Sequence, residues 1–205
     1  MKVTAIIAAA VIGLASAAPV AEPQEAASKP SVGGQTYFRA VASDSGTPIH
    51  LQNLHAADGK IWIGKKTEKF CPDSAKKAGK CPGGSGTAFL SVNPSPGTLY
   101  MGVSVPNGQQ VYIDQSTGAL AYTPGGDPNV PNGAITNGWT FNPDIGNGAG
   151  LLKWRRGLVA CSTTQVEGQY QIFANLKSVQ FSPGCVGPFA AVTSNVTSPQ
   201  AWQYE

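Results

Sequence analysis

Turn-forming residues interrupt this chain so often that short strands are expected rather than long helices. The 205 residues include 25 glycines and 16 prolines, which separate short apolar runs such as 60–63, 99–105 and 119–123. These runs alternate apolar with polar residues or are rich in β-branched and aromatic side chains, as strands are. Helical spacing of apolar residues never lasts beyond about two turns. The sequence therefore predicts an all-β protein.

The number of expected strands narrows the architecture. About ten to twelve short strands predict a compact antiparallel β-sandwich or barrel, and a β-trefoil is the alternative because its strand count is the same. Turn residues between the runs in 88–123 predict an antiparallel meander there, and 65–86 is expected to be a long loop. The strands are expected at 36–43, 48–54, 60–63, 88–92, 99–105, 109–114, 119–123, 157–161, 169–176, 189–193 and 201–204.

The first residues predict export. A positive start, an apolar run and Ala15-Ser16-Ala17 are typical of a signal peptide over 1–17. Residues 18–35 are rich in Ala, Pro, Glu, Ser and Gly, so we expect a flexible tail before one all-β domain at 36–205. No later stretch is apolar enough to span a bilayer, and no hydrophobic C-terminal tail predicts a lipid anchor. The expected location is outside the cell.

Four cysteines fit an oxidising compartment: Cys71, Cys81, Cys161 and Cys185. Three pairings are possible, and the sequence alone does not choose between them. We favour Cys71–Cys81 and Cys161–Cys185 because each pair closes a local loop. Such loops stabilise a fold by roughly 2.5–3.5 kcal/mol each. The sequon Asn195-Val196-Thr197 predicts that this region is accessible if it carries a glycan.

Binding features are more evident than catalytic ones. The net charge of +3 is too small to predict nucleic-acid binding. Lysines nevertheless concentrate in one segment, which is either an electrostatic surface for acidic polysaccharide or other anionic surfaces, or a solvated loop that adds solubility: Lys60, Lys65, Lys66, Lys69, Lys76, Lys77 and Lys80. At least two of the four tryptophans are expected in the core, and Trp62 and Trp154 are candidate sugar-stacking platforms.

Signatures of catalysis are weak. His50 and His55 are five residues apart, which on a strand puts them on opposite faces, so we expect no metal site and no cofactor. The segment around Ser85 lacks the strand and the final glycine of a nucleophile elbow. Most carboxylates adjoin turn residues, where they commonly bond their own backbone. We expect no catalytic residues, although a carboxylate pair of a glycan hydrolase stays open.

Several short blocks together resemble one known family. They are Pro48-Ile49-His50-Leu51, residues 60–64, Cys71-Pro72 with Cys81-Pro82, residues 108–114 with 118–123, and Ala201-Trp202-Gln203-Tyr204. The chain resembles the fungal secreted cell-wall family of PhiA, which is tied to phialide development and described as an IgE-binding allergen. The resemblance implies a role in phialide and conidium development and implies no catalytic residues. The chain differs from the family in its longer Ala/Pro-rich tail and in the loop around Lys76-Lys77.

The function expected from these observations is a secreted, non-enzymatic, fungal cell-wall component that acts through its surface. Wall polysaccharide is the expected partner, without nucleic acid and without a membrane anchor. The alternatives are a secreted glycan-binding module that acts on a host or competitor, and a carboxylate-dependent glycan hydrolase.

Overall fold

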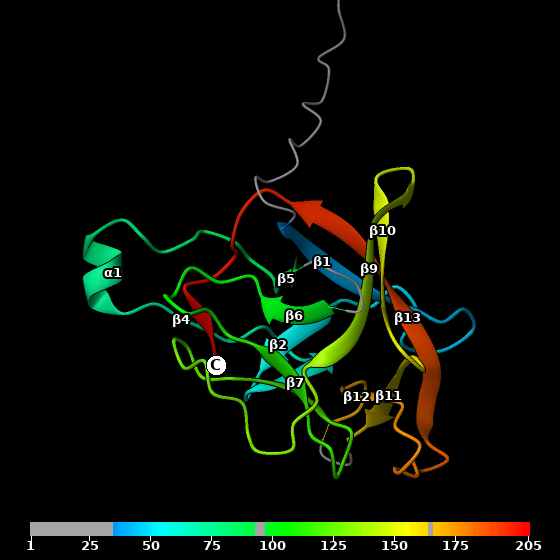
Figure 1. Ribbon diagram of the computed structural model, residues 1–205. Helices are drawn as coiled ribbons and strands as arrows, with labels where there is room; N and C mark the ends of the chain where they lie inside the picture. Colours follow the sequence, from blue (N-terminus) through cyan, green and yellow to red (C-terminus); the bar gives the residue numbers. More distant parts are fainter. Residues whose placement is uncertain (1–34, 93–96, 164–165) are drawn as a thin grey trace, which may run out of the picture.

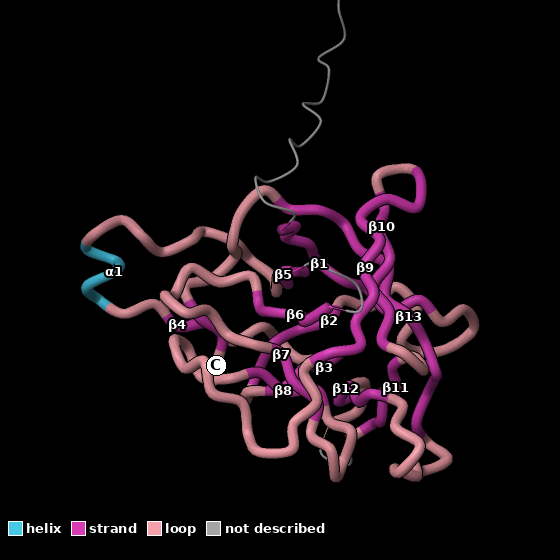
Figure 2. Tube along the Cα trace, viewed as in Figure 1, coloured by secondary structure: helices cyan, strands magenta, loops and turns pink. Residues whose placement is uncertain are grey.

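The computed structural model describes residues 35–92, 97–163 and 166–205 (Figures 1 and 2). The described chain is 48% strand and 3% helix, so the predicted all-β class is confirmed. The expected signal peptide and nearly all of the expected tail, up to residue 34, lie outside the described residues. No helix in the described ranges is long and apolar enough to cross a bilayer.

The strands follow one another in chain order with one short helix among them, α1 (Asp73–Lys77). Most are three to six residues long, as expected where turns are frequent. They are β1 (Gln35–Ser43), β2 (Leu54–Ala57), β3 (Lys60–Ile63), β4 (Lys69–Phe70), β5 (Phe89–Val92), β6 (Gly97–Met101), β7 (Val111–Ile113), β8 (Leu120–Tyr122), β9 (Asn137–Gly146), β10 (Ala149–Trp154), β11 (Leu158–Ser162), β12 (Tyr170–Ala174), β13 (Cys185–Val196) and β14 (Gln203–Tyr204).

Six strands close into a ring. Their order is β1-β5-β6-β9-β10-β13, and β13 pairs back to β1 from Ser43↔Ala190 to Tyr37↔Val196. Closure removes the free edges that an open sheet would expose. The ring is a barrel, as predicted, and the strand order is not the three repeats of four consecutive strands that the alternative β-trefoil requires.

A second group of strands is joined to the barrel through β13. The first half of β13 pairs with β11, and the sheet continues through β12, β3, β8 and β7, with β2 beside β3. We call the strands β11, β12, β3, β8 and β7 the sheet extension. Because β13 pairs with strands of both parts, the barrel, the sheet extension and β2 form one twelve-stranded antiparallel sheet.

Aromatic side chains fill the barrel. Phe38 on β1 is fully buried, and its ring stacks on Phe141 at 4.5 Å and on Phe89 at 5.9 Å between centroids. Neighbours at positions 40 and 42 of β1 are also buried, whereas Arg39 is only half-buried. The alternation of β1 therefore points one row of side chains into the barrel and the other out of it.

The hairpin at Asp58-Gly59 was predictable from two residues. Asp58 has a φ of 50° and Gly59 a φ of 67°, which is the pair of positive values that a two-residue type I′ turn needs. The turn joins β2 to β3 in the register Ala57↔Lys60. Gly64, just after β3, is required for a different reason, because a Cβ there would collide with the carbonyl of Gly168.

Both predicted disulfides are present. Cys161–Cys185 joins residues that face each other directly in the β11–β13 pair. Cys71–Cys81 closes the loop that carries α1, which extends away from the barrel in Figure 1. The free-energy gain from each comes mainly from restricting the unfolded chain.

Three local predictions were wrong. Residues 48–51 form turns instead of the start of a strand, Asn53 makes only an isolated bridge to Val41, and only Leu54 belongs to β2. The expected meander over 88–123 is split, because β6 pairs with β9 in the barrel while β7 pairs with β8 in the sheet extension. The expected loop 65–86 contains α1 and also β4, which pairs with β14 at the end of the chain. In all three regions the observed structure depends on pairing with segments that are distant in the sequence.

Candidate functional site: a groove on the sheet extension

A groove runs across the outer face of the sheet extension. Strand alternation builds it: Val111 and Ile113 of β7 are buried, so Tyr112 between them faces outward. The same rule turns Phe173 of β12 and Lys60 of β3 outward, since their neighbours Ile172 and Ile61 are fully buried. These three side chains line a cavity of about 370 Å³.

Alanines make the floor of this groove. Ala119 and Ala121 line it, and both are only 8% exposed. Ala121 lies opposite Tyr112 on one neighbour and opposite Lys60 on the other, while Ala119 bridges to Phe173. Small side chains between two larger aromatic ones leave a trough with Tyr112 on one side and Phe173 on the other.

Polar groups with spare hydrogen-bonding capacity surround the trough. Lys60, Asp114, Thr117 and Gln171 complete its lining. Within the described parts of the chain, the Lys60 ammonium and the Gln171 amide have no protein partner. Oδ1 of Asp114 accepts four hydrogen bonds from Ser116 and Thr117, and its Oδ2 has no hydrogen-bond partner among the described residues.

The Asp114 carboxylate is ionised under all ordinary conditions. Hydrogen bonds from the Ser116 hydroxyl and from Thr117 lower its pKa to about 2, and they outweigh a small opposing effect of burial. The phenol of Tyr112 is shifted the other way, because burial and the nearby Asp114 charge raise its pKa. The groove thus combines a fixed negative charge, a lysine and a neutral phenol.

Further aromatic side chains continue the same face. Trp62 lies two residues after Lys60 on β3 and opposite Gln171 on β12, and its Nε1 donates to the carbonyl of Ala57. The Lys65 ammonium lies 5.3 Å from the centre of the Trp62 ring. Phe181 packs edge-on against Phe173 with ring centres 5.8 Å apart. Aromatic planes with polar groups beside them suit ligands that have both apolar faces and hydroxyl edges.

Comparison with known proteins gives the family. A model of the PhiA-like secreted proteins matches residues 38–205, which include nearly all of the barrel and the whole sheet extension. The chain belongs to this family. It is therefore a secreted, extracellular protein, as its first residues predicted. No curated protein and no solved structure matches it.

The lysines predicted as one surface of this PhiA-like protein are separated by the fold. Lys65 is paired with Asp58 beside Trp62, and the Lys69 ammonium donates to the carbonyl of Gly84. Lys76 pairs with Asp73 on α1 at 3.1 Å. Lys66, Lys77 and Lys80 are exposed. Lys65 lies against Trp62, whereas Lys76, Lys77 and Lys80 lie on or directly after α1, in the segment that extends away from the barrel (Figure 1).

The prediction of an exposed Trp154 was wrong. Trp154 on β10 and Trp139 on β9 are each 2% exposed and lie opposite each other in the barrel wall. The Trp154 ring donates through Nε1 to the Asn137 carbonyl, and the Arg155 guanidinium covers it at 5.8 Å. The expectation that at least two tryptophans are in the core is confirmed, whereas Trp62 stays half-buried.

The remaining candidate side chains have local partners. The Asp44 amide donates to His50 Nδ1, and His55 Nδ1 contacts the Thr67 hydroxyl. Within the described residues, no three His, Cys, Asp or Glu side chains are grouped as metal ligands. Asp127 and Asp144 accept hydrogen bonds from their own turns. Asn195 of the sequon is exposed on β13.

Sequence reasoning missed most of the groove. Tyr112, Phe173 and Gln171 were not named as site residues because their strands are distant in sequence. One signal was available in 119–123, where outward-facing alanines alternate with Leu120 and Tyr122. Outward alanine on a strand indicates that something else covers or uses that face.

Proposed function

We propose that this protein is a non-enzymatic component of the fungal cell wall that holds wall polysaccharide in the groove between Tyr112 and Phe173. The groove is the observation that carries the proposal. It presents two aromatic walls and an alanine floor, which match the apolar face of a sugar ring. A secreted protein of a fungus meets such rings first in the wall of its own cell.

The polar lining supports a neutral glycan. Gln171, Lys60 and the free oxygen of Asp114 offer donors and acceptors at the rim, where the hydroxyls of a bound sugar would lie. Lys60 and Asp114 carry opposite charges, so the rim as a whole is not strongly positive. We therefore assign binding mainly to stacking and hydrogen bonds, with the exposed lysines near α1 adding a weaker, salt-sensitive attraction.

Binding assays on insoluble chitin and β-glucan test this function. We expect Tyr112→Ala and Phe173→Ala each to weaken binding about tenfold, and Ala121→Leu to do so by filling the trough. Phe70→Ala is the matched control, because Phe70 is an aromatic residue 45% exposed on β4, outside the groove. Equal binding by the groove variants and the control would rule out the groove.

Salt separates the two contributions. Binding by the groove should largely persist at about 0.5 M salt, whereas binding through lysines should be lost. Replacing Lys66, Lys76, Lys77 and Lys80 together by Ala should reduce retention at low salt and leave the high-salt value unchanged. If these four replacements abolish binding at both salt levels, the lysines and not the groove hold the wall.

We place this wall binding in phialide and conidium development, which the family resemblance implies. A polysaccharide-holding protein would reinforce the wall of spore-bearing cells without any chemical step. A fungal strain that lacks the protein should form fewer conidia, and the Tyr112→Ala, Phe173→Ala double variant should fail to restore them. Full restoration by that variant would separate development from the groove.

A further inference from the structure

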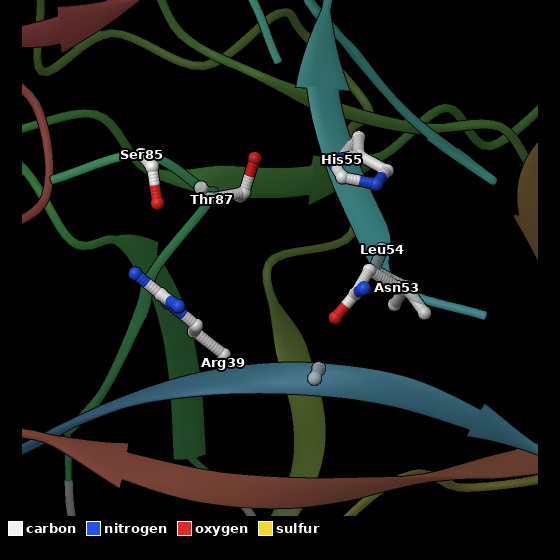
Figure 3. Close-up of a pocket in the computed structure, with 8 residues that line it drawn as sticks. Arg39, Asn53, Leu54, His55, Ser85 and Thr87 are labelled. Carbon is white, nitrogen blue, oxygen red and sulfur yellow. The ribbon is translucent and has the colours of Figure 1, made fainter. Parts of the chain in front are cut away.

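A second, smaller cavity lies on the other side of β2 from the groove's strands. Its volume is about 210 Å³, and its lining includes Arg39, Asn53, His55, Ser85 and Thr87. Arg39 comes from β1, His55 from β2, Asn53 from just before β2, and the other two from the segment before β5 (Figure 3). The Arg39 guanidinium and the Ser85 hydroxyl point toward each other in this view.

Arg39 brings a positive charge that the described protein does not balance. Its Nη2 donates to the Gln200 amide oxygen at 2.9 Å, which holds the guanidinium in place. Its Nε is buried and has no hydrogen-bond partner in the part of the chain that the structure describes. Among the described residues, no carboxylate lies within ion-pair distance of it. A half-buried guanidinium with an unpaired buried donor needs a water molecule or an anion to complete its hydrogen bonds, and its charge favours the anion.

The side of the cavity that His55 and Thr87 line carries no negative charge that could balance Arg39. The Ala56 amide donates to the Thr87 hydroxyl, which is 3% exposed and next to the Thr67 hydroxyl at 2.8 Å. The Thr87 hydroxyl then donates its own hydrogen bond to the Thr67 oxygen. The Thr67 hydroxyl donates in turn to His55 Nδ1 at 2.9 Å. In this arrangement every hydroxyl proton has an acceptor, and the neutral imidazole carries its proton on Nε2.

We propose that this cavity binds a small oxyanion on the Arg39 guanidinium. A carboxylate or phosphate would accept from the free Nε and from the Ser85 hydroxyl, as guanidinium groups favour. The cavity is smaller than a typical drug-sized pocket, so the ligand is the size of one acidic sugar or a free inorganic anion. This site is separate from the groove and does not depend on the function proposed there.

Two substitutions block the site without removing Arg39. Gln200→Glu places a carboxylate where the amide oxygen already contacts Nη2, so it supplies an internal anion. Gly86→Ala puts a methyl group 3.6 Å from Nε and 3.7 Å from Cζ, an ordinary contact distance that covers the guanidinium without a collision. Both variants should fold, because neither removes a packed side chain.

Calorimetric titration of the secreted protein tests the proposal with three probes: glucuronate, inorganic phosphate and glucose. Glucuronate or phosphate should bind, and glucose, which carries no charge, should not bind to this site. Binding of glucuronate alone identifies an acidic sugar, and binding of phosphate identifies a free anion. We expect Arg39→Met and Gln200→Glu to weaken binding at least tenfold, and Gly86→Ala several-fold.

Arg156→Met is the matched control, because Arg156 is an exposed arginine outside the cavity. It should bind anions as the unchanged protein does, and so should Tyr112→Ala, which alters only the groove. A thermal unfolding curve for each variant shows that it is folded. If no anion binds, or if Gln200→Glu binds as well as the unchanged protein, the proposal is wrong.

Discussion

Glutamine and tyrosine occur in two places, at the contact of the C-terminal strand β14 with Gln109 and in the groove, and their hydrogen bonds differ between the two. Gln109 is fully buried, its Nε2 donates to the carbonyls of Thr123 and Tyr204, and its Oε1 accepts from the Tyr204 amide. Gln171 lies in the groove with no protein partner among the described residues. Tyr204 and Tyr112 differ likewise, since only the Tyr204 hydroxyl is bonded to the backbone.

This difference separates groups that hold the fold from groups available to a ligand. A buried amide with all its partners fastens β14 to the β7–β8 hairpin across 95 residues of sequence. A polar group at the surface with unused capacity contributes little to folding and is free to bind. Substitutions in the two places should therefore affect different measurements.

The largest expected effect is from Gln109→Leu. It leaves the Tyr204 amide and two carbonyls buried without partners, so we expect the free energy of unfolding to fall by about 3 kcal/mol. Urea denaturation measures it. The matched control Gln171→Leu should stay within about 0.5 kcal/mol of the unchanged protein. Equal losses in the two variants would contradict the distinction.

Tyr204→Phe should have a smaller effect, about 1–2 kcal/mol. The Tyr204 hydroxyl accepts from the buried Ala88 amide at 2.8 Å, and the phenylalanine leaves that amide unpaired. Tyr112→Phe removes a hydroxyl that has no partner among the described residues and should change stability by only a few tenths of a kcal/mol. Denaturation of both variants compares them directly, and an unchanged Tyr204→Phe protein would show that water replaces the phenol.

Alkaline pH should act on the C-terminal strand first. Burial raises the pKa of Tyr204 to about 12 from its ordinary 10, so the folded state keeps the proton more tightly than the unfolded chain does. This contribution is complete below pH 10 and is lost as the pH rises from 10 toward 12. Unfolding curves across that range should show falling stability, with a shallower fall in Tyr204→Phe.

Acid should act on the cavity near Arg39. Burial lowers the pKa of His55 below its ordinary 6.5, so the unfolded chain binds a proton that the folded state resists. The contribution of His55 to the free energy of unfolding is fully present above pH 6.5 and declines as the pH falls below it. His55→Gln should flatten that decline. A variant that keeps the original slope would show that another group titrates in this range.

The smallest effect is expected at the groove rim, from Asp114→Asn. The amide oxygen keeps the place of Oδ1 in the turn, so we expect a loss of only a few tenths of a kcal/mol near neutral pH. The carboxylate's stabilising effect is present above pH 3.8 and disappears toward pH 2, and the variant should lack that dependence. An unaltered acid profile would mean that the turn is held by other bonds.

The sequence by itself determined the features that depend on neighbouring residues. The all-β class and several strands followed from alternation and turn residues, although β9 and β10 were not expected, and the Asp58-Gly59 turn followed from its need for positive φ. The preference for the two local disulfides, which the structure confirms, rested on loop length. Export followed from the first residues, and family membership supports it. Each of these is decided within a few residues, or within one loop, by local sterics or chain entropy.

Only the tertiary structure decided which distant segments meet. Strands β7 and β12 form one groove although about 60 residues separate them in the chain, and Gln200 holds Arg39 across a separation of 161 residues. Trp154 is buried because β10 faces into the barrel, a fact that its basic neighbours conceal. Strand pairing and burial depend on which faces come together, and local propensity contains no information about the partner.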